Sequence, residues 1–288
     1  MAAAADDTLN DNYDPKFTMK RLFFLALTLT LVLACNRSQT PKILVLYYSQ
    51  TGTTEAVAQA LQASLGADIE AIVPIEPYDG DYPATIARGR QELQEGILPE
   101  LQPLKSDISA YDIIFLGYPV WFGTYAQPIA TVLATQNFSG KKVVPFCTFG
   151  SGGLDSSTKG IREKLPDAEV LPGYGVRAAR IDAAPAEIDR FLKAGGFISG
   201  QFEKLEDFPA PQPVTEEESA IFDAAVGDYP MIHAKATEVA SRTVPEGREY
   251  LFTAHDLPRD GGETLGRELK VYILAADGQA PVFTQVIR

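Results

Sequence analysis

The chain has 288 residues, of which 45% are hydrophobic and 22% charged, and its formal net charge at pH 7 is −13. This composition is ordinary for a globular protein, and the length favours two compact domains. Because phosphate binding needs clustered lysines and arginines, the acidic balance argues against a nucleic-acid partner. Acidity of this kind keeps a protein in solution or steers it toward a basic partner protein. The two cysteines, Cys35 and Cys147, are too few for a disulfide framework.

Residues 1–34 are predicted to be an N-terminal extension followed by an export signal. The cationic segment 19–21 precedes an apolar run over 22–33, which is the order of a secretory signal peptide. The run continues into Val-Leu-Ala-Cys, which resembles a bacterial lipobox with valine where leucine is usual. The resemblance implies that Cys35 is lipidated and anchors the chain to a membrane of the cell envelope, on the periplasmic side. The alternative is a buried apolar segment with a chance cysteine.

From Pro41 onward, strand patterns alternate with helix patterns. Continuous apolar runs are typical of parallel strands that are covered on both faces, and apolar residues three or four positions apart indicate helices. The alternation predicts an α/β fold, a doubly wound parallel sheet with helices on both faces. Such sheets bind ligands at the carboxyl ends of their strands. The predicted strands are 42–48, 69–73, 112–117, 142–148 and 168–171, and the predicted helices are 54–65, 82–95, one from 128 and 184–193 with Asp182 as its N-cap.

The segment after the first predicted strand has the features of a phosphate site. It opens directly into a helix, whose N-terminal N–H groups and positive dipole end favour an anion. A glycine in its middle allows a tight turn, and hydroxyls on both sides of it can donate to phosphate oxygens. The segment lacks the lysine of a P-loop and the G-x-G-x-x-G of dinucleotide sites. An N-capping loop without a ligand is the alternative. Its residues are Ser49, Gln50, Thr51, Gly52, Thr53 and Thr54.

Two further segments follow predicted strands at the same edge of the sheet. The segment after the third strand is rich in aromatic residues and contains the single tryptophan of the chain. The segment after the fourth strand has three glycines, which allow its backbone N–H groups to approach a ligand closely. A packed aromatic cluster and a flexible turn are the respective alternatives. The candidate residues are Pro119, Val120, Trp121, Phe122 and Gly123 in the first of these segments, and Thr148, Phe149, Gly150, Ser151, Gly152 and Gly153 in the second.

Residues 41–199 resemble the flavodoxin-like family. The segment 49–54 matches the flavodoxin phosphate loop, T/S-x-T-G-x-T, at every defined position, and Gly-Tyr-Pro-Val-Trp-Phe-Gly over 117–123 is similar to the segment that lies along one face of the flavin ring. The resemblance implies non-covalent binding of FMN, with Trp121 stacked on the ring and residues 148–153 at its pyrimidine edge. A single phosphate loop fits FMN, which has one phosphate, better than FAD.

Residues 200–216 are predicted to be a stiff, exposed linker, because prolines alternate over 209–213 ahead of an acidic run. Residues 217–288 are predicted to form a small α+β domain, a helix followed by antiparallel strands at 250–255, 269–274 and 282–287.

Within this second domain, residues 243–252 faintly resemble the wedge hairpin of cystatin-like modules. Gly247, Tyr250 and Phe252 agree with that pattern, whereas the wedge glutamine is replaced by Thr243. Pro245 and Glu246 also depart from it. Since a fold does not fix a function, we expect this domain to bind a partner or to pack on the first domain, rather than to inhibit proteases.

The resemblance implies an exported FMN protein that acts in electron transfer or as a flavin-dependent reductase, with an unknown redox partner. The competing hypothesis is an envelope binding protein that keeps the fold without redox activity. No catalytic residue is assigned, because no side chain in the three segments has a proton-transfer pattern. The sequence predicts no metal site, since the two histidines, His233 and His255, form no cluster with cysteines. Cys147 is expected to be a buried strand residue.

Overall fold

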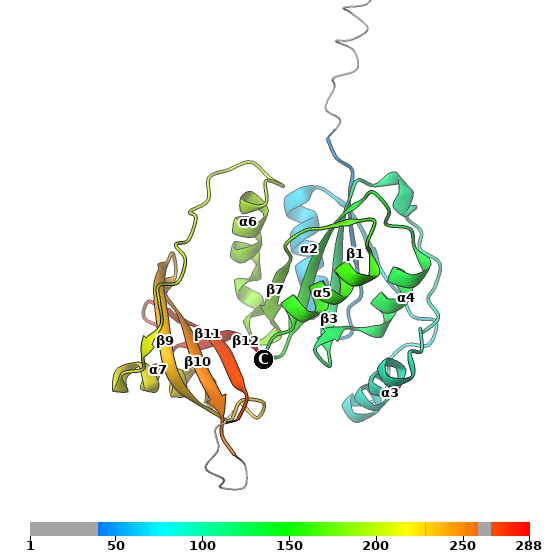
Figure 1. Ribbon diagram of the computed structural model, residues 1–288. Helices are drawn as coiled ribbons and strands as arrows, with labels where there is room; N and C mark the ends of the chain where they lie inside the picture. The colour runs from blue at the N-terminus through cyan, green and yellow to red at the C-terminus, as the bar shows by residue number, and fades with distance from the viewer. Residues whose placement is uncertain (1–39, 228, 259–265) are drawn as a thin grey trace, which may run out of the picture. The chain divides into compact units, whose positions relative to one another are not determined.

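A computed structural model describes residues 40–227, 229–258 and 266–288. The predicted signal peptide and Cys35 lie outside these residues. Among the residues described, no helix is both long and apolar enough to cross a membrane. Residues Pro41–Arg288 form one compact unit, which contains a mixed, mostly parallel sheet and a second, antiparallel sheet (Figure 1).

The first sheet is parallel along its main path, in the order β2-β1-β3-β5-β6. Its central strands read as apolar runs because both of their faces are covered. Beside β6, strand β7 pairs with the carboxyl half of β5, and the short β4 turns back antiparallel onto the end of β3. The strands are β1 (Ile43–Tyr47), β2 (Asp68–Ala71), β3 (Ile113–Trp121), β4 (Thr124–Tyr125), β5 (Lys142–Phe149), β6 (Glu169–Val170) and β7 (Tyr174–Arg177).

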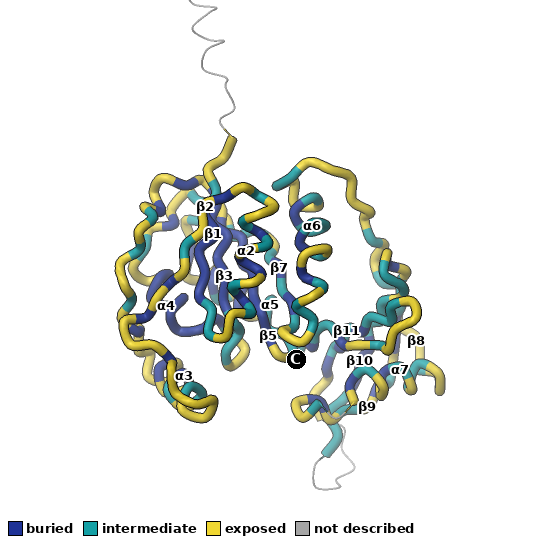
Figure 2. Tube along the Cα trace, turned by 180° about the vertical axis from the view of Figure 1, so that it is seen from behind, coloured by how far each residue is buried: buried dark blue, intermediate teal, exposed yellow. Residues whose placement is uncertain are grey.

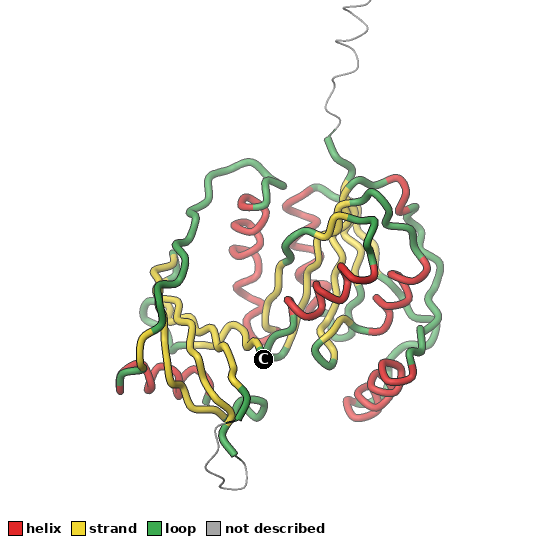
Figure 3. The backbone as a smooth tube through the Cα atoms, in the orientation of Figure 1, coloured by secondary structure: helices red, strands yellow, loops and turns green. Residues whose placement is uncertain are grey.

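Helices cover both faces of this sheet, and alternate residues of β1 show how the two cores divide. Leu44 and Leu46 belong to the core under α4 and α5, whereas Val45 and Tyr47 belong to the core under α2 and α6. Each fully buried side chain of this size contributes about 1.5–3 kcal/mol. Figure 2 shows these central strands as the buried part of the sheet, and Figure 3 shows the helices that flank them. The helices are α2 (Thr53–Leu65), α3 (Tyr82–Glu95), α4 (Gln127–Thr135), α5 (Leu154–Lys164) and α6 (Ala184–Ala194).

The second sheet is antiparallel, in the order β12-β11-β10-β9-β8. Helix α7 (Glu216–Val226) packs Phe222 into the core of this sheet, edge to face with Phe252. A reciprocal capping box between Thr215 and Glu218 begins the helix. The strands are β8 (Gln212–Pro213), β9 (Ala234–Val244), β10 (Gly247–Asp256), β11 (Glu268–Ala276) and β12 (Val282–Ile287).

Several sequence predictions differ from the structure. Asp182 does not cap α6, since the N-cap position is Ala183 and residues Ala178–Ala183 form a 3₁₀ turn that leads into the helix. Helix α5 was not predicted, although Leu154, Thr158, Ile161 and Leu165 have helical spacing; the glycine-rich segment ahead of it hides its start. The predicted strand 168–171 shortens to β6, and the chain pairs again with β5 as the unpredicted β7.

The predicted linker ends in a strand. Gln212 and Pro213 form β8, which pairs with Val239 and Glu238 of β9. A proline is tolerated there because β8 is the edge strand of the sheet.

Candidate functional site

The segment 49–54 forms a tight turn from β1 into α2. Gly52 is the N-cap of α2 at φ 84°, a conformation that favours glycine, and no side chain caps this helix. The Gly52 N–H donates to Oγ of Ser49 at 3.1 Å, and the hydroxyls of Thr51 and Thr53 lie 3.4 Å apart. The turn therefore presents an uncapped helix N-terminus surrounded by exposed hydroxyls, which is an arrangement suited to a phosphate group.

Thr54 joins this turn to the end of β5. Its Oγ1 lies 2.7 Å from Oγ1 of Thr148, and both side chains are buried. Thr148 is the first residue of the predicted third segment, so the structure brings the first and third segments together. A buried hydroxyl pair of this kind holds its partners in place, because either hydroxyl left alone would be desolvated without a hydrogen bond.

The second segment is more regular than predicted. Strand β3 continues through Pro119 and Val120 to Trp121, and turns back at Phe122 and Gly123 into β4. Phe122 has φ 53° and Gly123 has φ 80°, and the Phe122 side chain is 38% exposed. The hydroxyl of Ser156 donates to the Gly123 carbonyl at 2.6 Å, so α5 supports the turn. A hairpin thus replaces the predicted loop and leaves an aromatic ring at the surface.

Trp121 lies in a cluster of aromatic side chains. Its ring is edge to face with Tyr48, with centroids 5.9 Å apart, and with Tyr78, at 5.0 Å. A Cβ placed on Gly89 of α3 would lie 3.3 Å from the indole, so α3 approaches the ring closely. Trp121 remains partly exposed. Packing therefore fixes the edge of this ring, as the aromatic-cluster alternative expected, and leaves part of the ring accessible.

The third segment lies against the end of β3. A Cβ on Gly153 would lie 2.6 Å from Cγ1 of Val120, which brings the second and third segments together. Ser157 of α5 donates to the Gly153 carbonyl at 2.5 Å and accepts from the Tyr118 hydroxyl at 3.0 Å. With the Thr54–Thr148 pair, these contacts place all three predicted segments at one edge of the sheet.

Apart from Gln50, the sequence analysis did not assign a role to the residues that support this edge from the side of α3. The Gln50 side chain accepts from the Tyr48 hydroxyl and donates to the Tyr78 carbonyl. Burial, together with a 2.5 Å hydrogen bond to Glu92, raises the pKa of Tyr78. Arg88 pairs with Glu92 at 2.8 Å. The spacing of residues 88 and 92 on one helix could have predicted their ion pair, but nothing in the sequence links either residue to Tyr78.

The one cysteine among the described residues is enclosed in the core. Cys147 is fully buried in β5, as predicted, and burial raises the pKa of its thiol. Over the described ranges, no group of three or more His, Cys, Asp and Glu residues is arranged to hold a metal ion. The edge of the sheet thus offers hydroxyls, backbone N–H groups and aromatic rings.

Comparison with known proteins identifies relatives of the first domain. A family model described as flavodoxin matches residues 42–185, which is half of the chain. A candidate flavoprotein from Bacteroides eggerthii DSM 20697 is 31% identical over 52% of this chain and 98% of its own, with a TM-score of 0.45.

Two other solved structures are similar over the same share of this chain. A candidate flavoprotein from Bacteroides uniformis ATCC 8492 is 26% identical over 52% of this chain and 99% of its own, with a TM-score of 0.47. A flavoprotein from Lactobacillus acidophilus NCFM, crystallised in complex with FMN, is 26% identical over 52% of this chain and 97% of its own, with a TM-score of 0.44. No curated protein matches the chain.

Proposed function

The chain belongs to the flavodoxin family, and we propose that it binds FMN non-covalently and acts in electron transfer or as a flavin-dependent reductase. The observation that carries the proposal is the meeting of the three segments at one edge of the sheet. Thr54 pairs with Thr148 at 2.7 Å, and Gly153 lies against Val120. Ligands of doubly wound sheets bind at this edge.

The residues at the start of α2 fit the phosphate of FMN. The helix has no side-chain cap, and the position that a Cβ on Gly52 would take has open space around it. A phosphate there would accept hydrogen bonds from the first N–H groups of α2 and from hydroxyls such as those of Thr51 and Thr53. A single phosphate-binding turn suits a mononucleotide, which has one phosphate group.

Residues at the end of β3 and after β5 fit the ring. Trp121 and Phe122 would flank one face of the isoalloxazine, and the backbone of 149–153 would reach its pyrimidine edge. When bound, FMN supplies the electron-transfer chemistry. The protein binds and orients the ring, and burial keeps the hydroxyl protons of Tyr48 and Tyr78 in place by raising the pKa of both groups.

The first test is an absorbance spectrum of the purified protein after FMN is added and the sample is desalted. We expect retained flavin, with FMN released on denaturation. Thr51→Ala and Gly52→Val should each weaken the affinity for FMN about tenfold or more, because each removes or displaces a charge-assisted hydrogen bond.

Gly66→Val is the matched control for Gly52→Val. Gly66 ends α2 at φ 61° with open space around its Cβ position, so the substitution strains the same helix at its other end. This variant should bind FMN as the wild type does. A wild-type protein that retains no FMN would instead support the binding-protein hypothesis.

Reductive titration of the FMN-loaded protein separates the two redox roles. Two resolved one-electron steps support a carrier. A single two-electron step with turnover of NADH or NADPH supports a reductase. The acidic net charge of −13 favours a basic redox partner.

We also propose that Cys35 anchors the protein in the cell envelope. The support is the order of cationic segment, apolar run and cysteine in the sequence. Labelling of cells with a radioactive fatty acid should mark the wild-type protein and leave Cys35→Ser unlabelled. Equal labelling of both, or none of either, would contradict the anchor.

A further inference from the structure

The glycine-rich loop 149–153 is bonded through its backbone to the last strand of the antiparallel sheet. The Val286 N–H donates to the Ser151 carbonyl at 2.6 Å. A Cβ on Gly152 would lie 2.2 Å from the Val286 carbonyl oxygen, so only glycine fits there without a shift of the backbone. The Arg288 guanidinium, which donates to the Met231 carbonyl at 2.8 Å, also reaches Oγ of Ser151 at 3.5 Å. The loop and β12 therefore lie in direct contact.

Arg177, at the end of β7, bridges the two sheets. Its Nε donates to the Gly150 carbonyl at 2.9 Å, and its Nη1 donates to the Phe283 carbonyl at 2.8 Å. Its Cζ lies 3.4 Å from the centroid of the Phe283 ring and 5.4 Å from that of Tyr229. Burial lowers the pKa of this guanidinium, although the Tyr229 hydroxyl acts in the opposite direction. One side chain thus connects the loop to the core of the second sheet.

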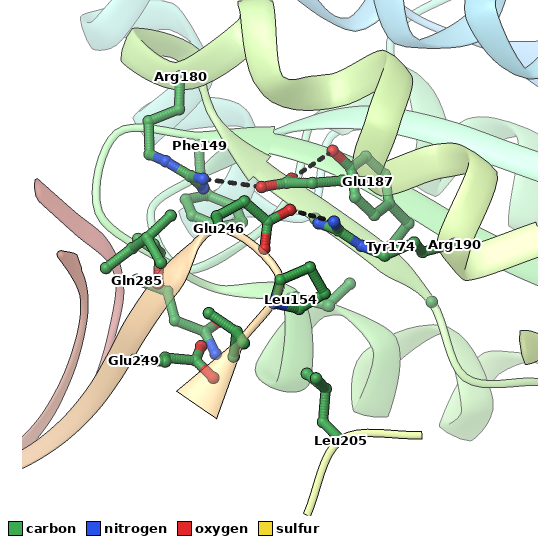
Figure 4. Close-up of a pocket in the computed structure, with 16 residues that line it drawn as sticks. Phe149, Leu154, Tyr174, Arg180, Glu187, Arg190, Leu205, Glu246, Glu249 and Gln285 are labelled. Carbon is green, nitrogen blue, oxygen red and sulfur yellow. Dashed lines mark hydrogen bonds and ion pairs between the residues drawn. The ribbon is translucent and has the colours of Figure 1, made fainter. Parts of the chain in front are cut away.

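A second contact ties the sheets together beside the loop. A cavity of about 320 Å³ is lined by residues of both sheets, among them Phe149, Leu154 and the β9–β10 turn. Figure 4 shows Phe149, Leu154 and Glu246 of this turn among the side chains that line it. Glu246 of that turn forms an ion pair with Arg190 of α6. The cavity's other ion pair joins Arg180 to Glu187 at 2.7 Å. The Pro245–Glu246 turn, where the cystatin-like wedge was expected, is thus occupied within this chain.

Glycine-rich loops sample many backbone conformations unless their surroundings select one. Three of the five residues of 149–153 are glycines. Gly153 is held from the first sheet, by Ser157 and Val120. The described contacts of 150–152 come from Arg177, Val286 and Arg288, so the conformation of these three residues depends on the second sheet. A binding loop that is held in its bound conformation binds more tightly, since less entropy is lost on binding.

We propose that the antiparallel sheet positions the flavin loop, with Arg177 as the positioning residue and Gly152 as the point of closest approach. The proposal rests on the proposed binding of FMN at this edge. It gives the second domain a role inside the protein, which is to fix the affinity and the midpoint potential of the bound FMN.

The test compares three variants of the full chain. Arg177→Met removes both bridging hydrogen bonds, and Gly152→Ala places a methyl group against the Val286 carbonyl. Arg180→Met is the matched control, because it removes a half-buried, ion-paired arginine three residues away whose described hydrogen bond goes to Glu187 and not to residues 150–153. Hydrogen exchange of the amides of 150–153 is measured without FMN, and the dissociation constant and midpoint potential are measured with FMN.

We expect Arg177→Met and Gly152→Ala to speed exchange in 150–153 and to raise the dissociation constant for FMN roughly tenfold, because the loop would no longer be held in its bound conformation. Both variants should also shift the midpoint potential. Arg180→Met should leave all three quantities unchanged, even if it lowers the unfolding temperature. If Arg177→Met does not fold, Gly152→Ala carries the same comparison.

Two negative outcomes are distinguishable. Normal FMN binding with unchanged exchange, affinity and potential in both variants overturns the positioning role and leaves the proposed function standing. A wild-type chain that binds no FMN overturns the proposed function and the flavin part of the inference. The exchange measurement then still decides whether the second sheet holds the loop.

Discussion

The loops after β1 and β5 reach the same edge of the sheet and are shaped by different parts of the chain. The turn 49–54 is shaped mainly by itself, through the positive φ of Gly52 and the bond from its N–H to Ser49. The central residues of the loop 149–153 are held by distant parts of the chain, since Arg288 is 137 positions from Ser151, and Arg177, which bonds Gly150, is in turn bonded to Phe283, 106 positions further on.

The difference shows which functional features a sequence motif can carry. A local turn needs only the right residues in order, because its own backbone and hydroxyls define the geometry. A glycine-rich loop does not define its geometry, so its conformation has to be supplied by a neighbouring surface. Changes in the second sheet should therefore reach the β5 loop and leave the β1 turn intact.

The largest effect is expected for Phe283→Ala. The ring is 2% exposed and lies under the Arg177 guanidinium, so its removal should cost about 3–5 kcal/mol of unfolding free energy and release the β5 loop. Urea unfolding measures the first effect, and hydrogen exchange of 150–153 measures the second. Exchange at the start of α2 should not change.

Phe222→Ala is its control. Phe222 is 1% exposed in the same core and packs on Phe252, and none of its described contacts involves the β5 loop. Phe222→Ala should lower the unfolding free energy by a similar amount without speeding hydrogen exchange in 150–153. Equal loosening of the loop in both variants would mean that the loop responds to general weakening of the sheet, not to the Arg177 contact.

An intermediate effect is expected where the two loops meet. Thr54→Val leaves the buried Thr148 hydroxyl without its partner, which should cost about 1–3 kcal/mol. The double variant with Thr148→Val should recover most of this loss, because two apolar groups of the same shape replace the pair. Urea unfolding of the single and double variants checks the coupling, and strictly additive losses would count against it.

A smaller effect is expected for Gly52→Ala. The added methyl group has open space around it, so only backbone strain should lower the unfolding free energy, by about 1–2 kcal/mol. Gly66→Ala should lower the unfolding free energy by a similar amount for the same reason. Because the β1 turn is self-contained, neither variant should change exchange in 150–153, and a change there would show that the two loops are more strongly coupled than their contacts indicate.

The smallest effect is expected at Glu70 of β2, whose described hydrogen bonds go to Lys105 and Ser106 and to neither loop, so that it serves as a reference. Burial raises the pKa of its carboxyl, but hydrogen bonds from Ser106 and Lys105 outweigh burial and hold the pKa below its ordinary value of 4.5. A carboxyl with a lowered pKa stabilises the fold above its unfolded pKa and loses that contribution as the pH falls through its folded pKa.

Wild-type protein should therefore be more stable than Glu70→Gln at about pH 7, with the difference shrinking toward about pH 3. Urea midpoints at the two pH values check the sign. A difference that grows as the pH falls would be inconsistent with a lowered pKa. FMN affinity should be the same in both proteins.

Much of the first sheet was predictable, because its strands are buried on both faces and read as apolar runs. Strand β1 and helix α3 fall where the sequence places them, and the tight turn 49–54 from β1 into α2 was predictable from Gly52. The extension of β3 to Trp121 was missed, because residues 117–123 were interpreted as a ligand-binding segment and not as a hairpin. Val120 pairs with Tyr125 across a two-residue turn at Phe122 and Gly123, and a glycine in such a turn is a local hairpin signal.

The partners of the β5 loop were the least predictable part of the site. Arg177 is an ordinary charged residue in sequence, and neither Val286 nor Phe283 differs from other residues of an alternating strand. Asp182 illustrates the same limit, because a residue that fits an N-cap by type was displaced by a 3₁₀ turn. The sequence therefore predicted the candidate site residues at this edge but not the distant residues that hold them in place.

The distance in sequence between Arg177 and Phe283 also sets an order of events during synthesis. Ribosomes extend a chain by about 5–20 residues per second, and domains generally fold as they emerge. The 106 positions between these residues correspond to roughly 5–20 seconds, during which the parallel sheet can fold while its β5 loop is still unsupported. A nascent chain should therefore acquire the turn 49–54 first and the supported β5 loop only after β12 has been made, so that this edge of the sheet matures in two stages.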